Sequence, residues 1–483
     1  MADAQLYIDG QLRAATDHRR YDVINPATGA IAGQAPDAGA ADMDQAIAAA
    51  RRAFDTTAWS TDRDLRIHCL SQLAQALQAA SEEWRPLIMA ETGCPIGLTY
   101  GPQCDIPVGG MNFHIDLLHH YAFERELPVT AAMGVPSKRL VWKEAAGVVG
   151  AISPWNMPVQ INLAKLMPAL AAGCTAVLKA APETPWSATF IGRIAAEKTD
   201  LPPGVLNIIT SGDRVTLGEQ LVTDPRVDMV SFTGSTATGR RVMELASRTV
   251  KKIFLELGGK SATILLDDAD FDQVLPGAMV VCYHAGQGCS IPTRLLIPRS
   301  RYAESVEKLK VYFEHLPFGN PNDPGQIMGP LISRRQQQRV LDYIRRGVAE
   351  GARLVAGNVE PPPGPGFYVR PTLFADVRND MTIAREEIFG PVLCVIPFDD
   401  DEDAIRIAND SIYGLSGAVF SASTERAMNV ARRIRTGTFN INGANYFAPD
   451  SPFGGYKQSG IGREMGIEGF EEYLQTKTVA VPA

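Results

Sequence analysis

Short apolar runs alternate with amphipathic stretches through the middle of the chain. Apolar runs that are bounded by turn residues and rich in β-branched side chains are typical of buried strands. Six such runs predict strands at Gly147–Ser153, Thr175–Lys179, Val205–Ile209, Met229–Thr233, Lys252–Leu257 and Ala262–Leu266. Helical patterns separate most of them, and strands that alternate with helices indicate a parallel sheet of the α/β class.

A second alternating series follows the first. It comprises predicted strands at Arg294–Ile297, Gly417–Phe420 and Gly437–Ile441 and a helix near Ala303–Phe313. The chain is therefore expected to form two large α/β domains, with a boundary near Gly258-Gly259. Residues 126–143 and the C-terminal residues fit neither series, and we expect them to form arms.

The N-terminal part begins with a predicted hairpin. Its first strand lies within Leu6–Gln11, where an Asp-Gly pair favours a tight turn. Amphipathic patterns then predict helices at Ala41–Phe54 and Leu65–Leu77, each with apolar residues on one face.

Composition narrows the function classes. The chain has 483 residues, of which 45% are hydrophobic and 21% charged, as is ordinary for a globular protein. Its 46 basic and 54 acidic residues give a net charge of −8, so nucleic acid and anionic membranes are not expected partners. Residues 145–164 carry no charge, but their prolines and amides favour a buried interior segment over a membrane span.

The cysteines indicate a reducing environment. Seven are scattered along the chain with no CxxC pair and no zinc-ligand spacing, which predicts free thiols and no metal site. The first residues, Met1 to Gln5, lack the basic and then apolar order of a signal peptide. We therefore expect a cytoplasmic location.

One cysteine, Cys289, has unusual neighbours. It lies within Gly286-Gln287-Gly288-Cys289-Ser290, where small residues leave its sulfur approachable. Such a thiol is a nucleophile when a donor stabilises the thiolate. The alternative is a buried, inert cysteine.

Two other motifs offer catalytic groups. Glu256 lies near the end of a predicted apolar strand, just before a double-glycine turn. In a dry cleft such a carboxylate would act as a general base. Asn156 lies between two prolines and is suited to donate to an oxyanion. The alternatives are a solvated loop acid and an asparagine that caps a turn.

Two motifs offer binding groups. Gly234 and Ser235 join a strand to a helix predicted at Arg240–Arg248, with Ser235 and Thr236 as caps. The free N–H groups at such a helix start attract anions, although a plain capped turn has the same pattern. Glu386-Glu387 precede an aromatic residue and a turn, and alone they indicate only a charged surface turn.

Taken together, the motifs resemble those of the aldehyde dehydrogenase superfamily across essentially the full chain. The matching segments, in order, are Pro154-Trp155-Asn156, Lys179 with Glu183-Thr184-Pro185, Phe232-Thr233-Gly234-Ser235, Glu256-Leu257-Gly258-Gly259-Lys260, Gly286-Gln287-Gly288-Cys289, Glu387-Ile388-Phe389-Gly390-Pro391 and Ser451-Pro452-Phe453-Gly454-Gly455-Tyr456-Lys457.

The resemblance implies NAD(P)-dependent, non-acylating oxidation of an aldehyde to the acid, through a cysteine thiohemiacetal and a thioester. It implies that Cys289 is the nucleophile, Glu256 the general base, Asn156 the oxyanion donor together with the Cys289 N–H, and Lys165 a supporting lysine. The cofactor residues that it implies are Ile152, Ser153, Trp155, Lys179, Gly212, Thr233, Gly234, Ser235, Glu387 and Phe389.

The resemblance also implies an architecture. Residues 1–125 and 144–256 correspond to a Rossmann-like cofactor domain and residues 257–466 to a catalytic domain. Residues 126–143 and 467–483 correspond to an arm that joins subunits, so a homodimer or homotetramer is expected.

Three positions depart from the common family pattern. His284 replaces a frequent asparagine and raises the alternative of a Cys–His hydrolase, in which Glu256 would have no role. Pro182 occupies a position that is often glutamate in NAD-preferring relatives, so NAD is expected and NADP stays open. Ala164 replaces a frequent tryptophan near the substrate channel.

The implied substrate tunnel is uncharged. It is lined by Met157, Ala164, Ile291, Phe447 and Phe453. An uncharged tunnel gives no partner to a charged aldehyde, and Ala164 leaves room for bulk, so we expect medium-to-bulky apolar aldehydes as substrates. A CoA-acylating semialdehyde dehydrogenase and a catalytically silent relative of the fold are the remaining alternatives.

Overall fold

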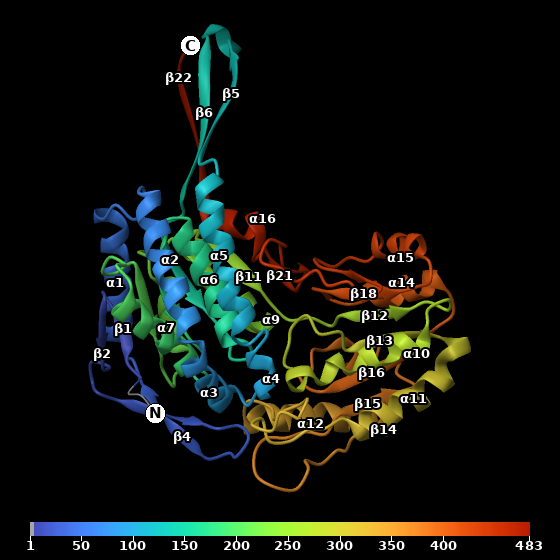
Figure 1. Ribbon diagram of the computed structural model, residues 1–483. Helices are drawn as coiled ribbons and strands as arrows, with labels where there is room; N and C mark the ends of the chain where they lie inside the picture. Colours follow the sequence, from blue (N-terminus) through green and yellow to red (C-terminus); the bar gives the residue numbers. More distant parts are fainter. Residues whose placement is uncertain (1–3) are drawn as a thin grey trace.

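The structure, a computed structural model, describes residues 4–483. Met1–Asp3 lie outside the described residues. They belong to the segment Met1 to Gln5, whose sequence lacks the pattern of a signal peptide. Two large sheets flanked by helices form the body, and a small sheet projects from it (Figure 1). The predicted α/β class with two large α/β domains is confirmed.

The first large sheet has eight strands. In spatial order they are β2 (Gln11–Arg13), β1 (Leu6–Ile8), β9 (Leu206–Ile209), β8 (Thr175–Lys179), β7 (Val148–Ile152), β10 (Met229–Thr233), β11 (Lys252–Glu256) and β21 (Gly460–Ile461). The five strands from β9 to β11 are parallel, and β1 and β21 flank them in antiparallel orientation.

Helices cover both faces of this sheet, which is why its central parallel strands are mainly apolar. In β8, Ala176 and Leu178 belong to one buried cluster and Val177 to another, as the alternation of side chains along a strand requires. The first cluster includes helices α2 (Arg63–Ala79), α3 (Ser81–Thr92), α5 (Asp105–His120), α6 (Pro158–Ala171) and α7 (Pro185–Lys198). The second includes α1 (Ala40–Thr56), α8 (Thr216–Thr223) and α9 (Thr236–Ala246).

The second large sheet has seven strands. Their spatial order is β14 (Arg353–Ala356), β15 (Thr372–Ala375), β16 (Val392–Phe398), β13 (Arg294–Pro298), β12 (Ala262–Leu265), β18 (Gly417–Phe420) and β19 (Asn440–Ile441). All but β14 are parallel to their neighbours. The helices of this half are α10 (Phe271–Val274), α11 (Tyr302–His315), α12 (Arg334–Ala349), α13 (Thr382–Arg385), α14 (Asp401–Asn409) and α15 (Thr424–Ala431).

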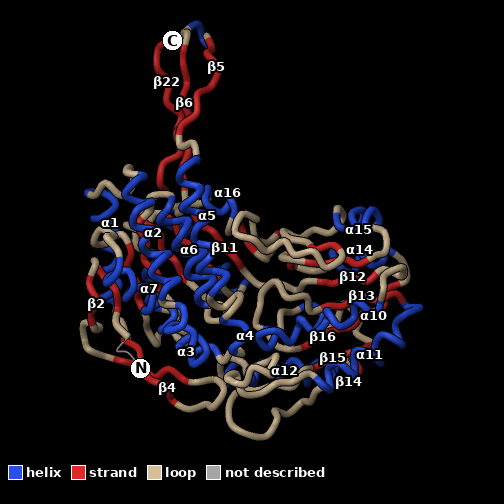
Figure 2. The backbone as a smooth tube through the Cα atoms, in the orientation of Figure 1, coloured by secondary structure: helices blue, strands red, loops and turns tan. Residues whose placement is uncertain are grey.

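The projecting sheet joins two distant parts of the chain. Its strands are β5 (Glu124–Thr130), β6 (Ser137–Ala145) and β22 (Leu474–Pro482), all antiparallel (Figure 2). Val129, Met133 and Val135 are exposed on it.

Several predicted elements are confirmed, and some bounds were wrong. The hairpin turns at Asp9 and Gly10, both with positive φ. The helix predicted from Arg240 begins at Thr236, because the Ser235 side chain accepts a hydrogen bond from the Thr238 N–H and caps it. Thr236 is not a second cap, since its hydroxyl donates to the Gln458 carbonyl.

The C-terminal part of the second series also differs from expectation. The strand predicted from Gly437 is formed only by Asn440–Ile441, because the Gly437 N–H bonds the Gly414 carbonyl instead of a ladder partner. After β20 (Tyr456–Lys457), β21 crosses back to pair with β11, and α16 (Gly466–Glu471) leads into the arm. Among residues 4–483, no helix is both long and apolar enough to span a membrane.

Candidate active site

Four parallel strands of the first sheet end side by side. Ile152, Lys179 and Glu256 are the last residues of β7, β8 and β11, and Thr233 is the last residue of β10. Ile152 pairs with Lys179, and Thr233 pairs with Glu256. In open α/β sheets the carboxyl ends of strands form the ligand-binding edge, and several predicted site residues are gathered there.

The loop that carries Cys289 packs against the end of β11. A side-chain carbon on Gly259 would lie 2.4 Å from the Cys289 carbonyl oxygen, so only glycine permits this approach. The Gly259 N–H also donates to Glu387 Oε1 at 2.9 Å. The double-glycine turn thus brings the loops before β13 and β16 to the strand ends of the first sheet.

Asn156 is the predicted oxyanion donor, and its amide is fixed in place. The side chain is 4% exposed, and its Nδ2 donates to the Gln287 carbonyl at 2.8 Å. An amide nitrogen has two N–H donors, so one remains for another acceptor. Gln287 is itself held, because its Oε1 accepts from the Ile332 N–H at 2.9 Å and its Nε2 donates to the His284 carbonyl.

Glu256 is buried without a partner among the described residues. It is 1% exposed, and neither carboxylate oxygen has a hydrogen bond. Burial, followed by the nearby Glu464 carboxylate, raises the pKa of Glu256 well above its ordinary value. A dry carboxylate with a raised pKa is a strong proton acceptor once ionised, which suits a general base.

The Cys289 thiol faces carboxylates. Burial raises its pKa, and the charges of Glu256, Glu387 and Glu464 raise it further. His284 does not act as the cation of a Cys–His pair, because burial lowers the pKa of its imidazole to about 4 and keeps it neutral. The structure therefore disfavours the hydrolase alternative.

Lys165 belongs to a buried polar network that the sequence did not reveal. Its Nζ lies 3.0 Å from Glu464 Oε1 and 3.2 Å from the Ser231 hydroxyl, which contacts the Tyr473 hydroxyl at 3.0 Å. Glu464 follows Lys165 by 299 positions, and no local pattern links residues that far apart. The network places one ammonium group beside the Glu464 carboxylate that acts on both Glu256 and Cys289.

The predicted ribose-binding lysine lies among polar groups. Lys179 is buried, and its Nζ makes one long hydrogen bond of 3.5 Å to the Ala180 carbonyl. Burial lowers its pKa, and the charges of Asp213 and Glu183 partly restore it. Glu183 is paired with Arg214 at 2.7 Å. The largely unused ammonium donors of Lys179 fit the hydroxyl groups of a ribose.

The other predicted cofactor residues line the same edge. Trp155 and Phe389 meet edge-on with ring centroids 5.4 Å apart, and burial raises the pKa of Glu387 to about 7. Gly234 lies next to the Phe232 ring, 2.6 Å from where its side-chain carbon would be. Ser153 directly follows β7, and Gly212 lies in the loop after β9. This set, with the α9 N-terminus, fits an elongated diphosphate-bearing cofactor.

A pocket between α5 and α6 contains two of the five predicted substrate residues, Ala164 and Phe447. Phe453 packs with Cys289 in a small cluster that Phe447 also touches. Ile291 lies beside Gly288 in the cysteine loop, and the Met157 sulfur accepts a hydrogen bond from Gln103. These three do not line the pocket.

The sequence did not predict the two polar residues of this pocket. His114 and Gln160 line it, whereas the sequence predicted apolar residues alone. No sequence motif marks His114 or Gln160, because each becomes part of the pocket only through the packing of α5 against α6.

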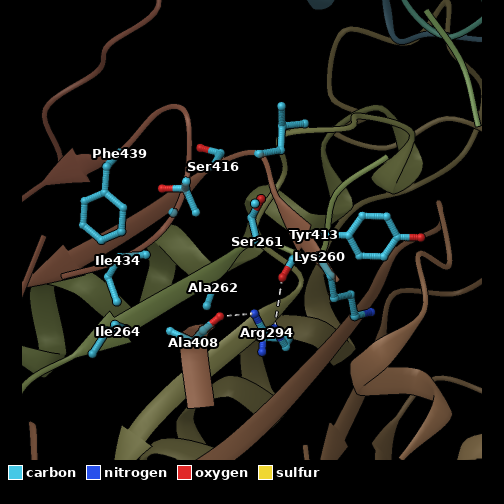
Figure 3. Close-up of a pocket in the computed structure, with 14 residues that line it drawn as sticks. Lys260, Ser261, Ala262, Ile264, Arg294, Ala408, Tyr413, Ser416, Ile434 and Phe439 are labelled. Carbon is cyan, nitrogen blue, oxygen red and sulfur yellow. Dashed lines mark hydrogen bonds between the residues drawn. The ribbon is translucent and has the colours of Figure 1, made fainter. Parts of the chain in front are cut away.

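A second pocket lies beyond the glycine turn in the other half of the molecule (Figure 3). Arg294 donates to the Lys260 and Ala408 carbonyls at 3.0 and 2.9 Å and fixes the chain there. None of the predicted aldehyde-binding residues lines this pocket. Within residues 4–483, no group of three or more His, Cys, Asp or Glu side chains is arranged to hold a metal ion.

The fold and site define an α/β protein with a cysteine, a buried carboxylate and an amide donor beside a nucleotide-binding edge. A model of the aldehyde dehydrogenase family matches residues 13–479. The chain is 45% identical to a 3-succinoylsemialdehyde-pyridine dehydrogenase of a Pseudomonas species, over 98% of each sequence.

Solved structures agree with this match. An aldehyde dehydrogenase of Mycobacterium tuberculosis, complexed with NAD+, is 43% identical with a TM-score of 0.95, over 99% of this chain and 98% of that one. A variant of aldehyde dehydrogenase C from Pseudomonas syringae, complexed with NAD+ and octanal, is 39% identical with a TM-score of 0.93, over 99% and 96%. The chain belongs to the aldehyde dehydrogenase family.

Proposed function

We propose that the protein oxidises an aldehyde to the carboxylic acid with NAD as cofactor. The observation that carries this proposal is the meeting of Cys289, Glu256 and Asn156, which come from three separate segments, at one edge of the first sheet. The NAD+ bound to two similar structures supports the choice of cofactor. The direct test is the absorbance of NADH when the purified protein, NAD and an aldehyde are mixed, with and without CoA.

The cofactor would be held by residues of the strand ends and of the second half. Lys179 would bind the adenosine ribose, Ser235 at the start of α9 the diphosphate, and Glu387 the nicotinamide ribose. Their positions support these roles, because the three groups lie at the ends of β8 and β10 and before β16. When bound, the nicotinamide supplies the acceptor for the hydride of the aldehyde.

Different residues of this chain would then carry out the successive steps of the oxidation. Cys289 loses its proton to solvent, and its sulfur forms a bond to the aldehyde carbon. The oxyanion that results is stabilised by the Asn156 amide and the Cys289 N–H, an effect worth about 3–4 kcal/mol per donor. Loss of the hydride leaves a thioester on Cys289. Glu256 takes a proton from water, the hydroxide attacks the thioester, and the acid leaves as the thiol is restored.

Glu256 favours hydrolysis over the two remaining alternatives. A CoA-acylating enzyme releases the acyl group by transfer to the thiol of CoA. A buried carboxylate that activates water beside the cysteine would then serve no function. A silent relative would need none of the three groups, yet Glu256 and Asn156 are both buried and the Glu256 charge acts on the Cys289 thiol. An acyl-CoA product in the test with CoA would favour the first alternative.

We propose medium-to-bulky apolar aldehydes, whether aromatic, terpenoid or longer aliphatic, as substrates. Ala164 and Phe447 border a mainly apolar pocket between α5 and α6, and burial of apolar surface contributes about 25 cal/mol per Å². The names of two similar proteins support this substrate class. One was solved in complex with octanal, and the other is named for a pyridine-bearing semialdehyde.

Filling this pocket should change the substrate range. Ala164→Trp should lower kcat/KM for octanal at least about tenfold, because the indole occupies space that the chain would use, and should leave acetaldehyde within about twofold. Ala164→Gly is the matched control and should keep octanal activity. Equal losses for octanal and acetaldehyde in Ala164→Trp would contradict this use of the pocket.

The cofactor preference gives another prediction. Pro182→Glu should raise KM for NADP more than KM for NAD, by about fivefold or more, because a carboxylate near Lys179 repels a 2′-phosphate and accepts from ribose hydroxyls. Pro182→Gln adds the same bulk without charge and should leave the ratio unchanged. An unchanged ratio in both variants would mean that position 182 does not face the ribose.

The domain roles and the assembly are proposals as well. Residues 1–125 and 144–256 would bind the cofactor, residues 257–466 would supply the nucleophile, and residues 126–143 and 467–483 would join subunits. The exposed apolar side chains of the arm support a homodimer or homotetramer. The seven free cysteines support a reducing, cytoplasmic setting.

A further inference from the structure

The pocket between α5 and α6 has a polar end that apolar aldehydes do not explain. His114 lines it and is 6% exposed, yet neither ring nitrogen has a hydrogen-bond partner among the described residues. Gln160 lines the same pocket, and its buried Oε1 is also unpartnered. Buried polar atoms are nearly always hydrogen-bonded, so several such atoms around one pocket indicate a ligand that completes them.

Ala164 opens the pocket to these groups. It lines the pocket together with His114 and Gln160, so a large side chain there would compete for the space beside them. Phe447 and Met465 also line it, and both belong to the cluster that contains Cys289. A substrate with its aldehyde at Cys289 could therefore extend its far end toward His114.

The chemistry of the polar end selects the ligand group. None of the described residues that line the pocket carries a formal charge, and burial lowers the pKa of His114 to about 4. The imidazole is thus neutral, with one N–H donor and one acceptor nitrogen. A charged group would lose its hydration without gaining a counter-ion.

We propose that the pocket recognises a neutral hydroxyl group at the far end of an otherwise apolar aldehyde. The hydroxyl accepts a hydrogen bond from the His114 N–H and donates one to Gln160 Oε1. A ketone or ether oxygen satisfies only the first of these atoms, and a methyl group satisfies neither. This inference rests on the proposed aldehyde oxidation and names its substrate class.

Pairs of aldehydes of equal size test it. We would compare kcat/KM for 4-(hydroxymethyl)benzaldehyde and 4-ethylbenzaldehyde, and for 4-(2-hydroxyethyl)benzaldehyde and 4-propylbenzaldehyde. In at least one pair the hydroxyl compound should be favoured about tenfold, because the analogue leaves buried polar atoms unpaired. The advantage should lie in KM, since the hydroxyl group lies far from the reacting carbon. A methoxymethyl analogue separates an acceptor from a hydroxyl and should fall between the two.

Two variants link the preference to its residues. His114→Phe and Gln160→Leu should each lower kcat/KM for the hydroxyl compounds more than for the ethyl and propyl compounds, and so remove most of the hydroxyl preference. His120→Phe, an exposed histidine on the same helix, is the matched control and should retain the preference. The thermal midpoint of each variant identifies a folding defect, so a variant that does not fold leaves the other as the test.

The outcomes separate this inference from the proposed function. If the wild-type protein oxidises the apolar members equally well as the hydroxyl members in both pairs, the hydroxyl inference is wrong and aldehyde oxidation stands. If no aldehyde gives NADH, the proposed function itself fails. A preference that survives in both His114→Phe and Gln160→Leu would also overturn the assignment to this pocket.

Discussion

Replacing Cys289 with alanine should lower kcat by about 10⁴-fold or more, because the reaction then has no atom to form the thioester. The other ordered groups would remain, since the Asn156 amide is held by Gln287 and not by the thiol. Stopped-flow absorbance of NADH should detect neither a burst nor steady turnover. Mass spectrometry of the quenched enzyme should find no acyl group.

A second cysteine variant controls for nonspecific damage. Cys69→Ala removes a fully buried thiol of α2, so it should lower stability by about 1–2 kcal/mol and keep kcat. The contrast between the two variants isolates the nucleophile. Normal turnover in Cys289→Ala would transfer the role to another group and end the proposed mechanism.

Replacing Glu256 with glutamine should separate the two half-reactions. The amide keeps the shape of the carboxylate but takes no proton from water, so steady-state turnover should fall by about 10²–10⁴-fold. A burst of NADH of about one per active site should remain, followed by a stalled thioester. Trapping of the acyl-enzyme by acid quench and mass spectrometry measures this directly.

The pH profile provides a check on the same residue. Because burial and Glu464 raise the pKa of Glu256, the carboxylate is ionised only as the pH rises through that raised value. Wild-type steady-state turnover should therefore increase with pH where hydrolysis of the thioester limits the rate. Glu256→Gln should lose this rise, and a variant with the wild-type rate and profile would contradict the assignment of the base.

A second buried acid controls for the replacement of a carboxyl group by an amide. Glu91 accepts hydrogen bonds from the Trp186 and Ser187 N–H groups at 2.8 Å, at the start of α7, and burial raises its pKa to about 8. Glu91→Gln should lower stability, because one carboxylate oxygen becomes an amide that cannot accept these bonds. Its ratio of burst to steady-state rate should match that of the wild type.

The network around Lys165 explains how this site tolerates several carboxylates. Glu256, Glu464 and Glu387 all raise the pKa of Cys289, and a cluster of buried negative charges is costly. The Lys165 ammonium offsets this cost where it contacts Glu464 at 3.0 Å. Tyr473 and Ser231 extend the network to the base of the arm, because Tyr473 directly precedes β22.

The sequence by itself determined the fold class and the five parallel strands of the first large sheet. A buried parallel strand is apolar on both faces, as the split of Ala176 and Val177 between two clusters illustrates, so its pattern is strong and local. The motifs around Cys289, Glu256 and Asn156 were also visible, because glycines and prolines mark unusual backbone. Their roles came from the resemblance of the whole set to one family.

Only the tertiary structure decided which distant groups meet. Glu464 contacts Lys165, from which it is separated by 299 positions, and β21 pairs with β11. No local sequence pattern indicates either of these contacts. Neither His114 nor Gln160 belongs to a motif that the sequence analysis singled out. They become the polar end of a pocket because α5 packs on α6 beside the small side chain of Ala164, and packing between elements is a property that no local pattern encodes.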